Sequence, residues 1–382
     1  MKSQKICIIG GGLTGLVTAI SLSRLNCHID LIVNNLRKKD KSNRTIAITE
    51  NNLDFLNGLN IAKNLKEKMW PSSIMELYGE VKNEKCSKIF EINNHGERKK
   101  ILYMIENSKI VKMMMDKIKK IKNISIKNNK RRIEIDNFGL LRNLKFDNYQ
   151  SKYNLIILCT GGNSNLVKDF FKDRLIKNSY KELSISTILS HASIKNNIAR
   201  QFFLNNEILA MLPISRTKTA IVWSIKKKLL NKKNFSIKKK IQLYTKNFLK
   251  RIKFFGKVEY KDLTFLIRNT YFQDRILLFG DALHTIHPFV GQGFNMTLRD
   301  LTSLENILNK KINLGLDIGS SDILSEFANE AKPRNLFFSL GVNFLKKSFS
   351  YKKPRNDILK LVNKNNFAKQ FFFNIADKGL KF

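Results

Sequence analysis

Residues 280–295, GDALHTIHPFVGQGFN, combine one carboxylate, two histidines and three glycines directly after the apolar run Arg275–Phe279. The run predicts a buried strand, and the stretch after it predicts a loop leading into a helix that begins between Gly291 and Gly293. Asp281 would then stand at the carboxyl end of a strand, where open α/β sheets bind ligands. The free N–H groups at the helix start favour developing negative charge. We therefore expect a loop that holds a polyhydroxyl chain and stabilises an electron-rich ring.

The amino-terminal stretch places Gly10, Gly12 and Gly15 in GxGxxG spacing. The stretch predicts a strand at Lys5–Ile9, a helix at Leu16–Leu25 and a second strand at His28–Val33. In such a context the first glycine permits a tight turn, the second lets the backbone approach a pyrophosphate, and the third lets helix and strand pack closely. The phosphate charge would lie at the helix N-terminus. We predict dinucleotide binding in preference to a glycine-rich turn without a ligand.

The end of the second predicted strand departs from the usual dinucleotide pattern. An acidic residue that bonds the ribose normally stands about twenty residues after the glycines. Here Val33, Asn34 and Asn35 occupy the strand end, and Asn34 can supply only an amide acceptor. A second GxGxxG after a strand and a CxxC pair are both missing from the sequence, which disfavours enzymes with two dinucleotide domains and disulfide reductases.

The composition is that of a basic globular protein. The 382 residues are 43% hydrophobic, and 70 Lys and Arg against 31 Asp and Glu leave a net charge of +39. This size and composition fit one large domain or two intimate ones. The charge is spread along the chain, and its longest clusters, Lys226–Lys228 and Lys238–Lys240, are short. We expect solvated lysines and no nucleic-acid partner, although a basic nucleic-acid-binding protein remains the non-enzymatic alternative, with strongly salt-dependent binding.

The four cysteines are far apart, so neither a disulfide framework nor a metal site is expected, and a reducing compartment fits. Residues 6–23 carry no charge, but their three early glycines argue against a signal or membrane segment. We expect a cytoplasmic protein, with peripheral contact on the inner face of the membrane as a further hypothesis.

The loop resembles that of the FAD-dependent aromatic hydroxylases of ubiquinone biosynthesis, single-component flavoprotein monooxygenases that include para-hydroxybenzoate hydroxylase. The family pattern is matched by Gly280, Asp281, Ala282, His284, His287, Pro288, Gly291, Gln292, Gly293 and Asn295. The resemblance implies that Asp281 binds the flavin ribityl chain, that the Gly291–Asn295 backbone faces the flavin pyrimidine edge, and that Pro288 lies near the carbon that binds oxygen. Cofactor contacts are also expected at Gly10, Gly12, Leu13, Thr14, Gly15, Asn34 and Arg44.

Other segments follow the family's order nearly end to end. The resembling segments are 44–61, with Arg44 expected near the cofactor, and 69–81, 102–110 and 209–225. One departure lies in 153–168, where Thr160-Gly161 or Gly161-Gly162 replaces the family's Asp-Gly pair. That replacement leaves open which donor reduces the flavin.

The resemblance implies a reaction. NADH or NADPH would reduce FAD, O2 would add to form a flavin hydroperoxide, and its distal oxygen would attack the ring of a polyprenyl-phenol. Other quinone-synthesis proteins are expected partners. We name no catalytic residue, since His284 and His287 in a rigid loop are expected to be hydrogen-bonding struts. The alternatives are an FAD-binding protein with another redox role, such as a halogenase or prenyl reductase, and a non-catalytic scaffold.

The predicted fold class is α/β, with a Rossmann-like FAD-binding domain, an inserted β-rich substrate domain and C-terminal helices. We place the FAD-binding domain at 1–70, 101–175 and 270–330, the substrate domain at 71–100 and 176–269, and the helical segment at 331–382. We expect that segment to pack on the FAD-binding domain. The alternative is a membrane-facing patch made by Phe344, Lys346, Lys347, Phe349, Lys352 and Lys353.

Overall fold

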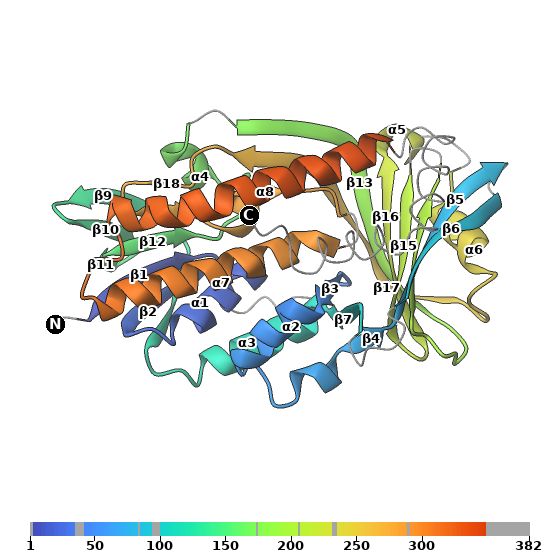
Figure 1. Cartoon of the computed structure of the whole chain (residues 1–382), viewed down its shortest axis with the longest axis horizontal. Helices are drawn as coiled ribbons and strands as arrows, with labels where there is room; N and C mark the ends of the chain where they lie inside the picture. Colours follow the sequence, from blue (N-terminus) through green and yellow to red (C-terminus); the bar gives the residue numbers. More distant parts are fainter. Residues whose placement is uncertain are drawn as a thin grey trace.

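The computed structural model describes residues 3–34, 42–82, 85–93, 100–172, 175–204, 207–230, 235–288 and 291–348. A mostly parallel sheet with its helices forms one end of an elongated molecule, and a larger, mostly antiparallel sheet forms the other (Figure 1). Two long helices run along the molecule and contact both ends.

The first sheet has six strands in the order β18-β19-β12-β1-β2-β8, all parallel except for the edge strand β18. Its strands are β1 (Gln4–Ile9), β2 (Cys27–Asn34), β8 (Ile124–Asn129), β12 (Leu155–Leu158), β18 (Phe272–Gln273) and β19 (Ile276–Leu278). Helix α1 (Leu13–Leu22) connects β1 to β2 and packs against α3 (Asn107–Ile118). The predicted strand, glycine turn, helix and strand are confirmed, and the helix begins three residues earlier than expected because Gly12 caps it.

Two small sheets flank this core. One is an antiparallel meander of β9 (Glu134–Phe138), β10 (Leu141–Phe146) and β11 (Tyr149–Tyr153). The other consists of β3 (Thr45–Thr49), β7 (Leu102–Glu106) and β4 (Trp70–Ser72). Between β3 and β4 the chain forms helix α2 (Glu50–Gly58) and a short 3-10 turn, η1 (Leu65–Lys68). The second small sheet lies between the two large ones (Figure 1).

The second large sheet has eight strands in the order β20-β17-β13-β16-β15-β14-β5-β6. They are β5 (Ile74–Lys82), β6 (Lys85–Asn93), β13 (Leu175–Ser190), β14 (Ile198–Phe203), β15 (Ile208–Ser215), β16 (Lys218–Lys226), β17 (Lys253–Arg268) and β20 (His284–Thr285). The short helices α5 (Lys227–Leu230) and α6 (Ile237–Thr245) accompany it, and Ile241 and Tyr244 of α6 join an apolar core around Trp223. The sheet is the β-rich insertion that the sequence predicts.

Strand β20 belongs to the 280–295 loop, which therefore joins both large sheets. The chain leaves the parallel sheet at Leu278, makes a 3-10 turn, η2 (Gly280–Ala282), and pairs His284 and Thr285 with Ile267 and Leu266 of β17. This pairing fixes the loop at the junction of the two sheets.

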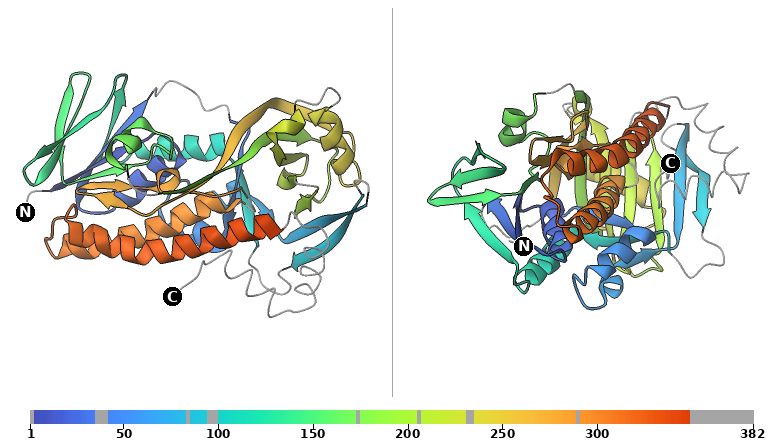
Figure 2. Two further views of the ribbon diagram at one scale, coloured as in Figure 1. Left: turned by 90° about the horizontal axis from the view of Figure 1, so that it is seen from above. Right: turned by 60° about the vertical axis from the view of Figure 1, so that its left-hand side comes forward.

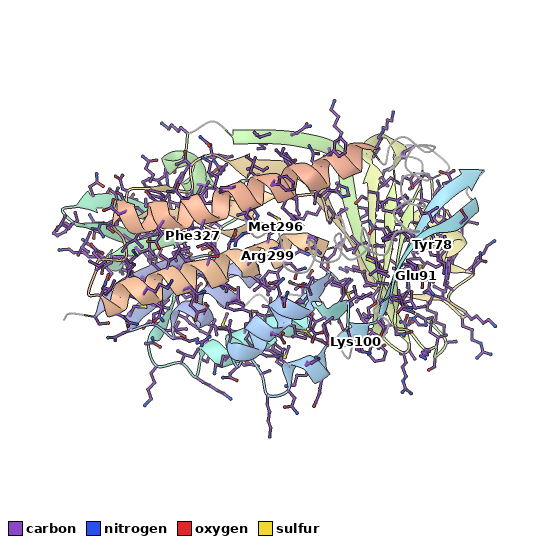
Figure 3. All side chains as sticks on the ribbon, in the orientation of Figure 1. Tyr78, Glu91, Lys100, Met296, Arg299 and Phe327 are labelled. Carbon is purple, nitrogen blue, oxygen red and sulfur yellow. The ribbon has the colours of Figure 1, made fainter. Side chains whose placement is uncertain are left out.

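Helices α7 (Gln292–Asn313) and α8 (Ser321–Ser348) lie side by side along the molecule (Figure 2). Met296 of α7 and Phe327 of α8, labelled in Figure 3, are fully buried. The Phe327 ring contacts those of Tyr271 and Phe279. The predicted boundary at residue 331 falls inside α8, which continues through Pro333. Among the helices of the described residues, none combines the length and the apolar character needed to cross a bilayer. A last short helix, α4 (Asn165–Phe170), follows β12.

Candidate active site

The glycine turn after β1 has the geometry of a nucleotide cradle. Gly10 has φ of +134°, and a Cβ there would lie 2.5 Å from the carbonyl oxygen of Cys159. A Cβ on Gly15 would lie 1.9 Å from the carbonyl oxygen of Gly10, so this glycine serves the close packing of helix on strand. A Cβ on Gly12 would meet no atom within 4 Å, and Gly12 caps α1 without a side chain. The turn thus offers open backbone N–H groups at a helix start.

A cleft of about 2360 Å³ begins at this turn. It is lined by Gly10, Gly12, Leu13, Thr14, Asn34, Arg44, Thr160, Gly161, Asp281 and Gly293. Residues from four distant parts of the sequence that were predicted to touch one cofactor therefore meet in one cleft. The volume of the cleft and the helix start, which has no side-chain cap, fit a dinucleotide.

The cleft also has a basic wall that the sequence analysis missed. Lys109 and Lys112 of α3 and Lys119, which caps its C-terminus, line it together with Arg131 and Arg132, and outnumber the two carboxylates of this wall, Asp116 and Asp169. Cations there favour phosphate groups. The spacing of the three lysines puts them near one face of a helix, a signal that could have been found from the sequence.

The two glycine motifs are in direct contact. Gly280 has φ of +62°, and a Cβ there would lie 2.6 Å from Cγ2 of Thr14. This contact brings Asp281 to the cleft, where its side chain is 55% exposed and lies 3.7 Å from Lys261 Nζ, so that its oxygens can also accept hydrogen bonds from a ligand.

A second cavity, of about 530 Å³, lies between the eight-stranded sheet and the loop. Its apolar lining includes Met75, Leu102, Ala210, Leu212, Val222 and Ile286. Ser184, Ser186 and Gln201 add hydroxyl and amide groups. Pro288 and Gly291 line this second cavity, and Arg44 lines both spaces, so the two cavities adjoin at the loop.

The cations that line the second cavity from the described residues each have a carboxylate partner. Arg200 Nε lies 2.9 Å from Glu76, Arg44 Nε lies 3.7 Å from Glu259, and Lys261 Nζ lies 3.7 Å from Asp281. The site therefore offers a mostly apolar space with neutral polar groups and internally balanced charges.

Gln292 and Asn295 lie at the start of α7, but neither lines the cleft or the second cavity. Asn295 is fully buried, and its amide donates to the Ala47 carbonyl at 3.0 Å and accepts from Asn52 at 3.1 Å. Gln292 is 3% exposed, and neither its amide oxygen nor its amide nitrogen has a partner in the described part of the chain. Asn295 thus ties α7 to β3 and α2, whereas Gln292 keeps hydrogen-bonding capacity beside the junction.

His284 and His287 are hydrogen-bonding struts, as predicted. His284 Nε2 lies 2.9 Å from Asp300 Oδ2, and His287 Nε2 lies 3.3 Å from Glu182 Oε2. Burial acts to raise the pKa of Asp300, but the hydrogen bond from His284 and the charge of Arg334 outweigh it and hold the pKa below its usual range. Burial lowers the pKa of His287. Both histidines are almost fully buried, so neither can reach a ligand in the cleft.

The wall at Thr160-Gly161 lines the cleft with a hydroxyl and a glycine of φ +82°. Thr160 Oγ1 is buried and has no hydrogen-bond partner in the described part of the chain. The four cysteines are free thiols.

The chain also resembles known proteins in sequence. The model of the FAD binding domain family matches residues 3–335. The mitochondrial ubiquinone biosynthesis monooxygenase COQ6 of Caenorhabditis elegans is 25% identical over 68% of this chain and 67% of its own length. That of Dictyostelium discoideum is 22% identical over 97% and 88%.

Solved structures with the same fold have lower identity. p-Nitrophenol 4-monooxygenase PnpA from Pseudomonas putida has a TM-score of 0.79 at 13% identity and covers 100% of this chain and 99% of its own. Klebsiella pneumoniae HpxO, solved with FAD and uric acid, has a TM-score of 0.76 at 13% identity over 98% and 97%. These likenesses confirm the predicted α/β fold class.

Proposed function

The chain belongs to the FAD binding domain family, and from this premise we propose that it is an FAD-dependent monooxygenase that hydroxylates the aromatic ring of a polyprenyl-phenol in ubiquinone biosynthesis. The observation that carries the proposal is that an apolar cavity adjoins the dinucleotide cleft at the 280–295 loop. The assignment to ubiquinone biosynthesis is supported by the similarity of the chain to the COQ6 monooxygenases.

The residues of the cleft divide by the part of FAD that each would hold. Gly10, Gly12, Leu13 and Thr14 would bind the pyrophosphate, and the cations of α3 would add to the binding of its charge. Asn34 would face the adenosine ribose, and Asp281 would accept hydrogen bonds from the ribityl hydroxyls. Bound FAD would supply the electron transfer and oxygen activation that side chains lack.

The second cavity would bind the phenol ring. Its apolar walls exclude water, and Ser184, Ser186 and Gln201 can orient a hydroxyl substituent. Because Arg44, Arg200 and Lys261 are each paired with a carboxylate, the cavity offers no free cation from the described residues to a ring carboxylate. This balance favours a neutral phenol over an aromatic acid.

The membrane contact remains a narrower proposal. Phe344 of α8 is 70% exposed, which suits an interfacial contact. Lys346, however, is only 13% exposed and donates to Glu182, so the expectation that it faces the membrane is wrong. The side chain of Lys347 and residues Phe349, Lys352 and Lys353 lie outside the described part of the chain.

The proposal is tested by the visible spectrum of the purified protein, followed by anaerobic addition of NADH or NADPH with and without a prenylated phenol. We expect a yellow protein whose flavin bleaches faster when the phenol is present. Aerobic turnover under ¹⁸O₂ should place one labelled oxygen on the ring. A protein that binds FAD but is inert to both nicotinamides would favour another donor or a scaffold role, which the replacement of the family's Asp-Gly pair in 153–168 also supports. A protein unable to take up FAD would refute the assignment of the cleft.

A further inference from the structure

A buried chain of charged groups connects the loop to the C-terminal helix. Lys346 of α8 donates from Nζ to Oε2 of Glu182 at 2.8 Å, and Nε2 of His287 lies 3.3 Å from the same oxygen. Exposure of the three side chains is 13%, 8% and 1%. Pro288, which lines the second cavity, directly follows His287. A charged residue of the last helix is therefore two contacts away from the cavity wall.

The geometry fixes the form of the imidazole. A carboxylate can only accept hydrogen bonds, so Nε2 of His287 carries the proton that faces Glu182. Nδ1 is buried and has no partner among the described residues. A neutral ring leaves Nδ1 as an unpaired acceptor, whereas a protonated ring would bury an unpaired N–H donor next to the Lys346 charge.

The surroundings determine which form is stable. Burial and the charge of Lys346 lower the pKa of His287, and the hydrogen bond to Glu182 opposes them. The other titratable groups that face the chain are Tyr180, whose ring lies edge-on to His287 at 5.2 Å and beneath Lys346 at 3.7 Å, and Lys226, whose charge acts on Lys346. Glu182 thus has two possible cationic partners, Lys346 and His287, and Lys346 is the partner that carries the positive charge.

Helix α8 also contacts the carboxylate that is bonded to the other loop histidine, His284. Asp300 Oδ2 bonds His284, while its Oδ1 lies 3.1 Å from Arg334 of α8, and the adjacent Asn335 donates to Oδ2 at 2.9 Å. Both buried carboxylates that hold loop histidines therefore receive a cation from α8.

We propose that Lys346 is a positioning residue of the site: by neutralising Glu182 it keeps His287 uncharged, and it thereby holds Pro288 in place at the wall of the substrate cavity. The inference rests on the proposed function only in naming the cavity as the substrate's. Loss of the Lys346 charge would leave His287 as the one counter-ion of Glu182 among the described residues and convert His287 to a cation.

The test compares the FAD-loaded wild type with Lys346→Met, Lys346→Arg and the double variant Lys346→Met/His287→Gln, with Lys310→Met, at an exposed position of α7, as the control. In the wild type the pKa of His287 is depressed, so stability is lost as pH falls. In Lys346→Met it would be raised, so stability is lost as pH rises. The deficit in melting temperature of Lys346→Met should therefore be at least about twofold smaller at about pH 6 than at about pH 8.

Protonation of Glu182 would also narrow the deficit at low pH, so the protonation of His287 is followed directly by imidazole ¹⁵N NMR, and the double variant identifies the His287 signal by lacking it. We expect a protonated ring at about pH 6 in Lys346→Met, a neutral ring in the wild type, and wild-type behaviour in Lys346→Arg and Lys310→Met. A deficit in Lys346→Met that is equal at both pH values, or a His287 ring that stays neutral in that variant at about pH 6, would overturn the proposal. These measurements do not use the phenol, so they remain decisive if the proposed reaction proves wrong.

A functional readout addresses positioning itself. We expect Lys346→Met to release at least about threefold more hydrogen peroxide per nicotinamide oxidised than the wild type at about pH 6, because a displaced cavity wall admits water. Lys346→Arg should restore the wild-type ratio. An unchanged ratio in Lys346→Met would refute the positioning role.

Discussion

Gly280 packs directly on Thr14, although 265 residues separate them. Gly280 begins the turn that carries Asp281, and Thr14 belongs to the first turn of the helix that follows the glycine motif. The two halves of the proposed cofactor site, already joined through the pairing of β1, β12 and β19, thus also meet in a direct contact between a glycine and a methyl group.

That contact predicts the effect of Gly280→Ala. The variant would need a positive φ in a residue that has a Cβ, and the Cβ would lie 2.6 Å from Thr14. We expect a loss of about 1–3 kcal/mol in unfolding free energy together with reduced FAD retention, measured by urea unfolding and by visible absorbance. Gly58→Ala is the control, since a Cβ at Gly58 meets nothing within 4 Å. Equal stability of the two variants would contradict the packing argument.

Gly12→Ala and Gly15→Ala should separate cofactor binding from folding. A Cβ at Gly12 projects into open space at the cleft, so we expect wild-type stability of the FAD-free protein but FAD binding weakened by at least about tenfold. A Cβ at Gly15 would overlap the Gly10 carbonyl, so that variant should lose stability even without FAD. Fluorescence titration with FAD and thermal unfolding measure the two effects. Wild-type FAD affinity in Gly12→Ala would refute the cradle.

The second cavity predicts a selective loss in Ala210→Phe. The larger ring would fill space beside Leu212 and Val222 without reaching the cleft. We expect FAD content to be retained, while the acceleration of flavin reduction by a prenylated phenol disappears. Leu140→Phe, at a position 81% exposed, should leave both unchanged. Loss of FAD in Ala210→Phe would show that a change in the second cavity also disturbs the cofactor cleft, and would contradict this prediction.

Asp300 predicts a component of the acid sensitivity. Its carboxylate is fully buried and bonded to His284, Arg334 and Asn335, and its pKa is held below the usual range. A depressed carboxyl pKa stabilises the fold above the unfolded value, about 3.9, and that stabilisation is lost as pH falls below it. Asp300→Asn leaves buried His284 without its carboxylate partner and removes one of the two carboxylates that face Arg334, so we expect a loss of about 3 kcal/mol near neutral pH.

The measurement for Asp300 is the free energy of urea unfolding between about pH 6 and about pH 3. The deficit of Asp300→Asn should shrink toward the acid end, since the wild type loses there what the variant already lacks. Asp54→Asn, at an exposed carboxylate of α2, serves as the control and should follow the wild type. A deficit that grows on acidification would contradict the assigned direction of the shift.

The elements that the sequence predicted best carry local patterns. The glycine turn after β1 and the loop after β19 combine periodicity, glycine spacing and a strand–turn–helix order within about thirty residues. Both were found where expected. The identity of the loop as a junction between two sheets was not predicted, because β20 is two residues long and its partner strand gives no sign of the pairing.

The partners of the two histidines could not be predicted for a related reason. Glu182 lies in β13, 105 residues before His287, and Lys346 belongs to α8. In the sequence Lys346 belongs to a basic and aromatic stretch that favours a surface assignment, and only the tertiary fold places a carboxylate against it. Likewise, nothing in the sequence indicated that one helix crosses the predicted boundary at residue 331, yet α8 continues through Pro333, with buried Phe327 and Phe338 packed against the core on either side of it.

The strand order of the first sheet bears on how the protein can be synthesised. Its central strand β1 is paired with β12, and β12 is paired in turn with β19, so neighbouring positions are filled from residues 4–9, 155–158 and 276–278. A nascent chain would expose the apolar flank of β1 until more than a third of the sequence had left the ribosome, and the sheet would stay incomplete until nearly three quarters had. Non-local pairing of this kind folds slowly and leaves unpaired strand edges open to aggregation. Production of the full-length protein in soluble form should therefore depend on chaperone capacity and respond to lower growth temperature.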